Sequence, residues 1–203
     1  MSTSLAQLTE QFARLLGSAA PAGSPVVTGL AEVGPAVAKP MADKPASPPP
    51  AIPAPATAAT PAAPAVVAPP PPNPIQSVDY ALKGYHFDVT VASNQVVAAA
   101  EILNQAGFGM DTITGVDWIA QNEMEVVYDY FHPTSPLRVV VRTRIPRATP
   151  ELPTIAGVFP GANWHERETH DFFGIRFAGH PNLTPFLLPE DADFHPLLKD
   201  YKP

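Results

Sequence analysis

The placement of proline limits what this chain can fold into more than any other feature. Of its 28 prolines, 17 lie between Pro21 and Pro74, in a stretch made mostly of alanine and proline. Proline removes a backbone hydrogen-bond donor, and this stretch has neither the period of a strand nor that of a helix. We therefore expect residues 18–74 to form a disordered, extended linker. Residues 75–203, about 130 residues, are expected to form one domain with one core.

The first 17 residues differ from the linker that follows them. Apolar side chains recur there at helical spacing, and Gly17 ends the pattern. We expect residues 1–17 to form a short amphipathic segment that docks at the end of the linker. A membrane-surface helix is the less favoured interpretation, because Arg14 is the only basic residue of the segment. The sequence shows no secretory pattern and no apolar stretch near the roughly 20 residues that cross a bilayer.

Charge and cysteine content exclude several classes of function. The chain has a net charge of −7, and residues 75–203 hold 9 basic and 16 acidic side chains. Such a domain is a poor partner for nucleic acid or anionic lipid. The sequence contains no cysteine, which excludes cysteine-ligated iron–sulfur clusters, thiolate zinc sites and disulfides. We expect no cofactor in this chain.

Alternating and helical patterns predict an α+β domain. Tyr85–Val91 alternates as a half-buried strand, and residues 110–119 indicate a second strand. Between them we expect a helix that is capped by Ser93 or Asn94 and stopped by Gly107. The expected fold is a small mixed or antiparallel sheet with helices packed on one side, followed by an irregular C-terminal tail.

Residues 123–131 and 137–145 predict a β-hairpin with one charged face. The antiparallel register in which paired residue numbers sum to 267 places every acid opposite an arginine. The facing pairs are then Asp129 with Arg138, Glu125 with Arg142, and Glu123 with Arg144. Each pair adds only about 0.2–1 kcal/mol, but together they specify the register. The arginines could instead form a basic patch for phosphate, and the matched acids favour a solvated ladder.

Two helices are predicted beyond the hairpin. Thr149-Pro150-Glu151 is typical of a helix start and predicts a short helix ending near Gly157. A second helix, capped by Asn163, is expected over Trp164–Phe173 and should end at Gly174. Closely spaced prolines beyond residue 177 forbid long elements, so this region forms the irregular tail.

The histidines of the second helix suggest a metal hydrolase, and their spacing argues against it. The zinc-protease motif has two histidines four residues apart, which lie on one face of a helix. His165 and His170 are five apart, about 140° around the helix. A free-standing metal hydrolase is therefore kept only as a minor alternative.

The acidic residues of this helix could be proposed as an acid–base pair for hydrolysis. Glu166, Glu168 and Asp171 have no nucleophile or phosphate loop beside them in the sequence, so a structural or interfacial role is favoured. Arg167 and Asp171 stand at i,i+4 and are expected to pair on the helix surface. A cation site is a further alternative to a docked tail, and its residues would be His180, Glu190, Asp191 and His195.

The segment from Trp164 to Ile175 resembles the Glu-Arg-Glu-x-x-Asp-x-Phe-Gly-Ile signature of the 30-kilodalton subunit of respiratory complex I, the C-subunit family of the NADH–quinone oxidoreductases. Shorter blocks continue the resemblance in order: Phe177, Gly179-His180-Pro181, Leu187-Leu188-Pro189-Glu190-Asp191 and His195-Pro196-Leu197. The resemblance covers roughly residues 78–203 and does not extend to the linker.

This resemblance implies a non-catalytic subunit in the hydrophilic arm of a proton-translocating NADH–quinone oxidoreductase. The partner would be the 49-kilodalton-type subunit, and iron–sulfur clusters and FMN would be held by neighbouring subunits. The location would be peripheral, on the cytoplasmic side of the cell membrane. The residues implied to meet partners are Trp164, Glu166, Arg167, Glu168, Asp171, Phe173, Gly174, His180, Pro181, Glu190, Asp191, Lys199 and Asp200.

One departure from the family pattern widens the choice of complex. The usual ending Pro-Leu-Arg-Lys-Asp is here Pro196-Leu197-Leu198-Lys199-Asp200, so that Leu198 replaces an arginine. His170 stands at a variable position of the signature, and in this it resembles relatives from membrane-bound nickel–iron hydrogenases, which have histidine there. The alternative is therefore the equivalent subunit of an energy-converting hydrogenase or a related oxidoreductase.

Overall fold

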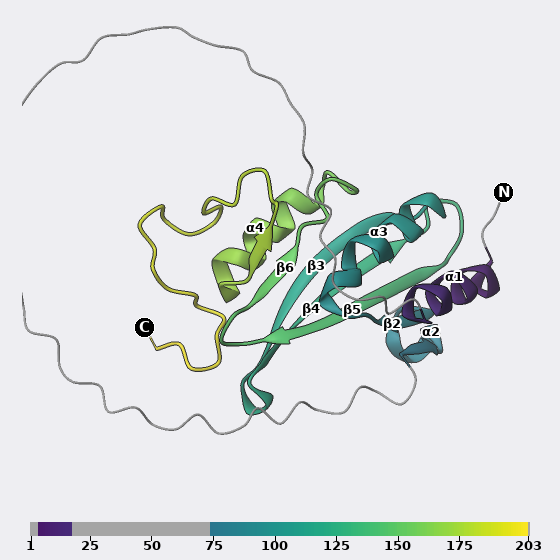
Figure 1. The fold of residues 1–203 in the computed structure, drawn as a ribbon, viewed down its shortest axis with the longest axis horizontal. Helices are drawn as coiled ribbons and strands as arrows, with labels where there is room; N and C mark the ends of the chain where they lie inside the picture. The colour runs from purple at the N-terminus through teal and green to yellow at the C-terminus, as the bar shows by residue number, and fades with distance from the viewer. Residues whose placement is uncertain (1–3, 18–73, 203) are drawn as a thin grey trace, which may run out of the picture. The chain divides into compact units, whose positions relative to one another are not determined.

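The computed structural model describes residues 4–17 and 74–202, and the linker expected over 18–74 lies outside them except for Pro74. The centre of the fold is a five-stranded sheet with the strand order β1-β2-β5-β4-β3 (Figure 1). Strands β2 and β5 pair in parallel, and the other neighbouring pairs are antiparallel. The strands are β1 (Ile75–Ser77), β2 (Phe87–Thr90), β3 (Gly109–Trp118), β4 (Glu123–Phe131) and β5 (Arg138–Pro146). The expected α+β class with a mixed sheet is confirmed.

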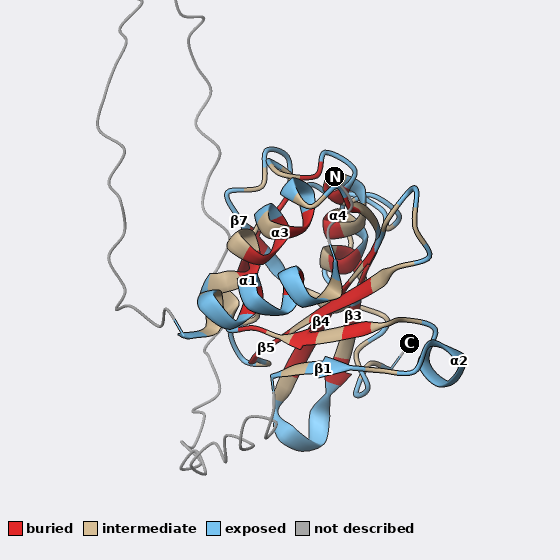
Figure 2. Ribbon diagram, turned by 90° about the vertical axis from the view of Figure 1, so that its right-hand side faces the viewer, coloured by how far each residue is buried: buried red, intermediate tan, exposed pale blue. Residues whose placement is uncertain are grey.

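The three longer helices cover one face of this sheet (Figure 2). The helices are α1 (Leu5–Gly17), α2 (Tyr80–Lys83), α3 (Val96–Gln105) and α4 (Ala162–Phe173), with 3-10 turns η1 (Ser93–Gln95) and η2 (Ile119–Gln121). Two further short strands, β6 (Glu151–Pro153) and β7 (Arg176–Ala178), form a separate parallel pair. No helix within residues 4–17 and 74–202 is long and apolar enough to span a bilayer.

The core follows from strand alternation in register. Val89, Val141, Tyr128 and Ile113 lie side by side across β2, β5, β4 and β3, and each is at most 5% exposed. Because alternate side chains of a strand point to the same face, the predicted strands bury one continuous apolar surface. Helix α3 packs its own buried residues Ala99, Ala100 and Leu103 into this cluster.

Helix α1 packs on the same domain. Leu8 and Phe12, one helical turn apart, are both fully buried, and the Phe12 ring lies 6.1 Å from that of Phe87. The Gln95 side chain donates a hydrogen bond of 2.9 Å to the carbonyl of Leu15. The predicted amphipathic helix is confirmed, and its apolar stripe faces the domain.

Helix α4 lies against β3 at a glycine. A Cβ atom built at Gly115 would be 2.6 Å from Cδ2 of Phe173, closer than a carbon contact allows. Gly115 shares its face of the sheet with Val126, its partner on β4, so the helix rests on the core side. The absence of a side chain at residue 115 therefore sets how closely α4 approaches the sheet.

The β4–β5 hairpin forms with a register two residues from the predicted one. Glu125 pairs with Arg144 and Phe131 with Arg138, so that paired numbers sum to 269 and not 267. A two-residue shift keeps each side chain on its face, and for this reason the apolar pattern could not detect the error. The long arginine side chains nevertheless reach the expected acids diagonally. The nitrogen–oxygen distances are 3.2 Å for Arg138–Asp129, 4.0 Å for Arg142–Glu125 and 3.1 Å for Arg144–Glu123.

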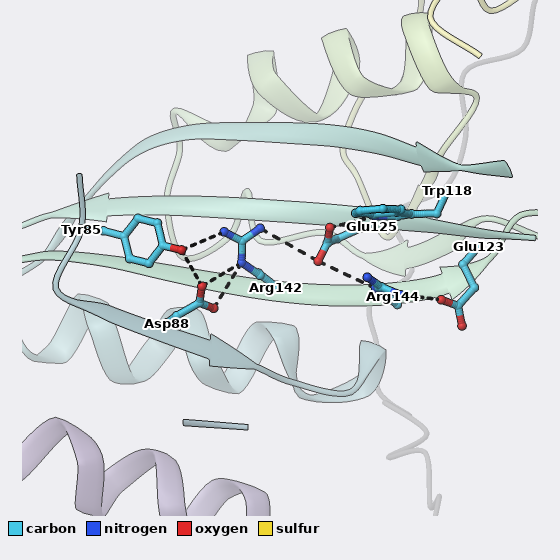
Figure 3. Close-up of polar contacts among 7 residues, drawn as sticks. All are labelled: Tyr85, Asp88, Trp118, Glu123, Glu125, Arg142 and Arg144. Carbon is cyan, nitrogen blue, oxygen red and sulfur yellow. Dashed lines mark hydrogen bonds and ion pairs between the residues drawn. The ribbon is translucent and has the colours of Figure 1, made fainter. Parts of the chain in front are cut away.

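Neighbouring strands extend this charged ladder (Figure 3). Arg142 donates to Asp88 on β2 at 3.0 Å and to the hydroxyl of Tyr85 at 3.3 Å. Trp118 donates its indole N–H to Glu125 at 2.9 Å, and Arg144 lies over the Trp118 ring. The ladder interpretation of these arginines is confirmed, because each one has an acidic partner.

The helix predicted over residues 149–157 is wrong. Glu151–Pro153 is instead strand β6, where Leu152 pairs with Phe177 of β7 and both are almost fully buried. Leu152 precedes Pro153, and a residue before proline disfavours the helical conformation. This restriction and the burial of Leu152 outweigh the local signal for a helix start at residues 149–151.

Two predicted helix caps are also wrong, whereas both predicted helix ends are correct. Ser93 forms part of the turn η1, and the side chains of neither Ser93 nor Asn94 cap α3. Asn163 lies inside α4, which begins after Gly161 without a side-chain cap. Gly107 and Gly174 follow α3 and α4 with positive φ values of 85° and 72°, as a glycine stop requires.

The Gly115 contact predicts a packing defect. Gly115→Ala places a methyl group against the Phe173 ring, and we expect the free energy of unfolding to fall by about 1–3 kcal/mol. Gly157→Ala is the matched control, because a Cβ there would meet nothing within 4 Å; we expect it to change stability by about 0.5 kcal/mol or less. Urea unfolding of both variants checks this. Equal stabilities would show that α4 does not rest on residue 115.

Candidate partner-docking site

Helix α4 and the C-terminal tail meet through the charged residues of the Trp164–Gly174 segment. The helix places Glu166 toward the core, Arg167 at its side and Asp171 near its end. Glu166 is fully buried, Asp171 is 4% exposed and Arg167 is partly exposed. The expected Arg167–Asp171 ion pair does not form, since each side chain bonds to the tail instead. The site is therefore a junction between a helix and an irregular segment.

Glu166 anchors α4 to the segment after β6. Its carboxylate accepts hydrogen bonds from the hydroxyl of Thr154 at 2.5 Å and from the backbone N–H of Ile155 at 2.8 Å. Burial raises the pKa of the Glu166 carboxyl to about 7, and these two hydrogen bonds only partly offset the loss of solvent. Near neutral pH this carboxyl is thus partly protonated in the folded protein.

His180 lies beside Glu166 in the same buried space. The Nε2 atom is 3.7 Å from the Glu166 carboxylate, and both side chains are fully buried. The backbone N–H of Asn182 donates to Nδ1 at 3.1 Å, so Nε2 carries the proton that faces the carbonyl of Asn163 at 3.3 Å. Burial lowers the pKa of His180 while it raises that of Glu166. Both shifts favour neutral forms, so the contact is not a strong ion pair.

Asp171 organises the bend of the tail at residues 186–188. One carboxylate oxygen accepts backbone N–H groups from Phe186, Leu187 and Leu188, at 2.8, 2.7 and 3.2 Å. Burial alone would raise the pKa of Asp171, but the hydrogen bonds from Leu187, Phe186 and Leu188 outweigh it and hold the pKa below its usual range. The ionised carboxylate thus satisfies three amides that have no sheet or helix partner.

Arg167 binds the two residues that come just before this bend. Its Nε and Nη2 atoms donate to the carbonyls of Thr184 at 3.0 Å and Pro185 at 2.8 Å. The guanidinium carbon lies 5.3 Å from the ring centre of Trp164 and 4.9 Å from that of Phe186. The two rings are themselves 5.2 Å apart. The guanidinium group therefore packs at the surface against two aromatic rings that also contact each other.

The rest of the tail is attached at two further points. His195 contacts the carbonyl of Asp171 through Nδ1 at 2.8 Å, and a Cβ atom at Gly174 would lie 2.7 Å from the His195 ring. Near the C-terminus, the backbone N–H of Lys199 donates to the buried Asp117 at 2.8 Å. Arg147 binds Asp117 and Asp200 at 2.8 and 2.5 Å. Leu198, in the place of the family arginine, packs against the core.

The remaining residues predicted to meet partners differ in how far they are exposed. Phe173 is half-buried against Gly115, and Trp164 is 54% exposed. Glu168, Pro181, Glu190 and Asp191 are exposed. Sequence reasoning missed Asp117, Arg147 and Thr154. No signal in the sequence marks Asp117, because apolar residues stand on both phases of residues 110–119.

The suggested metal sites receive no support from this geometry. His170 contacts the carbonyl of Ile175 through Nδ1 at 3.0 Å, away from His165 along the helix. Among the residues that the structure describes, no group of three or more His, Cys, Asp or Glu side chains is arranged to hold a metal ion. The same holds for the cation site considered in the tail.

Comparisons with known proteins identify the family of this chain. The sequence profile of the family described as respiratory-chain NADH dehydrogenase, 30 Kd subunit, matches residues 89–203. The chain belongs to this family, which confirms the resemblance seen in the sequence.

Relatives and a solved structure show how far the similarity extends. The C subunit of NADH-quinone oxidoreductase from Roseiflexus sp. is 42% identical over 92 residues, which are 45% of this chain and 53% of the relative. The C subunit of F(420)H(2) dehydrogenase from Methanosarcina mazei is 39% identical over 92 residues, 45% of this chain and 58% of the relative. The chain thus matches little more than half the length of these relatives. A chain of the membrane-bound sulfane sulfur reductase, an archaeal respiratory membrane complex, has a TM-score of 0.53 and 29% identity, covering 57% of this chain and 71% of that chain.

The hydrogen bonds of Asp171 predict that a substitution there loosens the tail at residues 186–188. Asp171→Asn removes the charge that three amides share, and we expect the free energy of unfolding to fall by about 1–3 kcal/mol. Amide hydrogen exchange should become faster at residues 186–188. Asp191→Asn, at an exposed position, is the control. Unchanged protection of these three amides would contradict the assigned role.

The raised pKa of Glu166 predicts a pH-dependent stability. Between 4.5, the ordinary value, and about 7, the folded state holds a proton that the unfolded state has released. The contribution of Glu166 to the free energy of unfolding therefore falls as the pH rises through this window, by about 3 kcal/mol in all. Glu166→Gln cannot titrate, so it should gain stability relative to the wild type from pH 5 to pH 8.

Urea unfolding at several pH values tests this expectation, with Glu168→Gln at an exposed position as the control. A difference between wild type and Glu166→Gln that stays constant with pH would contradict it.

Proposed function

We propose that the chain is a non-catalytic subunit in the hydrophilic arm of a proton-translocating NADH–quinone oxidoreductase. In this role it docks on the 49-kilodalton-type subunit and supports electron transfer to quinone without carrying electrons itself. The observation that carries the proposal is the family match over residues 89–203, which includes the whole junction between α4 and the tail.

The use of the carboxylates in this junction supports a structural role. Both oxygens of Glu166 and one oxygen of Asp171 accept hydrogen bonds from backbone and hydroxyl donors of their own chain. Asp117 does the same with Arg147 and the amide of Lys199. Groups engaged in this way hold a segment in place, whereas an acid–base catalyst needs a free oxygen facing a substrate.

The proposal places cofactors and membrane contact in partner subunits. This chain contains no cysteine with which to ligate an iron–sulfur cluster, so clusters and FMN would be held by neighbours. The protein would lie on the cytoplasmic side of the cell membrane and be attached through the complex.

A second candidate is the equivalent subunit of a related membrane oxidoreductase, including an energy-converting nickel–iron hydrogenase. Two observations favour keeping it. The similar proteins include a subunit of an F(420)H(2) dehydrogenase and a chain of a sulfane sulfur reductase. Leu198 also departs from the usual family ending.

Purification of the tagged full-length chain from its native host in mild detergent distinguishes the candidates. We expect large redox subunits to be recovered with the chain and identified by mass spectrometry. Paired cysteine motifs for nickel–iron ligation in the large subunit would select the hydrogenase, and their absence would exclude it. Recovery of a lone monomer would contradict both.

A further inference from the structure

Four side chains at the junction of α4 and the tail form an exposed surface with an unusual composition. Trp164, Phe186 and Leu187 are 54%, 39% and 54% exposed, and the guanidinium group of Arg167 lies over both rings. We call these four residues the aromatic–arginine surface. Aromatic residues and arginine are the types enriched at protein interfaces, where they supply much of the binding free energy.

Arg167 differs from the other arginines of the chain. The sequence has seven arginines, and the six at positions 14, 138, 142, 144, 147 and 176 each form an ion pair with an acidic side chain. Arg167 forms none with the residues that the structure describes, although the chain carries a net charge of −7. Its positive charge is therefore available to a group outside the chain.

The geometry of the guanidinium group defines that outside group. A guanidinium has five N–H donors, and Arg167 uses Nε and one donor of Nη2 for the Thr184 and Pro185 carbonyls. The Nη1 group and the second Nη2 donor remain, which suits a carboxylate bound by two hydrogen bonds. The two aromatic rings beside the guanidinium group would limit the access of water to such a contact and make it stronger.

The surface is also held rigid before any partner arrives. Asp171 binds the amides of residues 186–188, directly after the two carbonyls that orient Arg167. Little conformational freedom is then lost on binding, which lowers the free-energy cost of association.

We propose that the aromatic–arginine surface binds a carboxylate side chain, flanked by apolar residues, on a partner protein. This inference rests on the proposed function and specifies it, because it assigns one contact by which the chain docks in its complex. A single arginine within an apolar surface on an acidic chain favours a protein carboxylate over an anionic lipid or a nucleic acid.

Variants of the full-length chain in the native complex test the proposal. Arg167→Gln and Trp164→Ala should each weaken recovery of the partner subunits by about tenfold or more. Arg176→Gln and Leu82→Ala are matched controls at exposed positions outside this surface, and they should change recovery by less than about twofold. Equal recovery with all four variants, alongside normal recovery with the wild type, would overturn this proposal and leave the proposed function intact.

A photo-cross-link separates direct contact from loosening of the tail. Leu187 is replaced by p-benzoylphenylalanine, which leaves the hydrogen bonds of Arg167 in place. We expect cross-links to a partner peptide that contains Asp or Glu. Changing that acid to arginine should restore recovery with Arg167→Glu. Cross-links to a second copy of this chain, to lipid, or to nothing within an intact complex would each overturn the assignment. Failure of the wild type to recover any other protein of the complex would contradict the proposed function and, with it, the partner supposed here.

Discussion

Three amides of the C-terminal tail donate to one oxygen of Asp171, and the junction between α4 and the tail depends on this interaction. The tail is rich in proline and forms no helix or strand beyond Ala178 among the described residues. Some of its backbone amides donate to carbonyls of nearby turns, whereas those of residues 186–188 donate to a side chain. With residues 186–188 held, the preceding carbonyls can orient Arg167, and the rings of Trp164 and Phe186 can pack against its guanidinium group. Asp117 has a similar role near the C-terminus, where it accepts a hydrogen bond from the backbone N–H of Lys199.

Buried charge in this protein serves attachment. Glu166 connects α4 to the segment after β6, and its raised pKa records the free-energy cost of placing a carboxylate away from water. The exposed face of the sheet uses charge differently, since its arginines and acids form a ladder in which every member has a partner (Figure 3). Only at Arg167 is an arginine left without an acid from the described residues. The junction of α4 and the tail thus combines a rigid internal network with one open positive charge, a combination suited to docking.

Helix α1 adds a second junction on the same domain. Leu8 and Phe12 complete the apolar cluster beside α3 and β2, so the segment at the far end of the linker contributes to the core of the domain. The amphipathic pattern could predict the helix and its buried stripe. It could not identify the surface that receives the stripe, because an apolar side chain has no directional preference for one apolar surface over another.

The sequence by itself determined the class of fold, most strands, the glycine ends of α3 and α4, and the family, because these follow from local periodicity, backbone restrictions and ordered motifs. Only the tertiary structure decided the hairpin register, since a shift of two residues leaves every side chain on the same face. It also decided that Glu151–Pro153 is a strand, because burial of Leu152 beside Phe177 outweighs a local helix signal. The partners of Arg167 and Asp171 were likewise decided in three dimensions. Spacing along a helix can bring the two side chains together, but it cannot show that carbonyls and amides some 15 residues away lie closer.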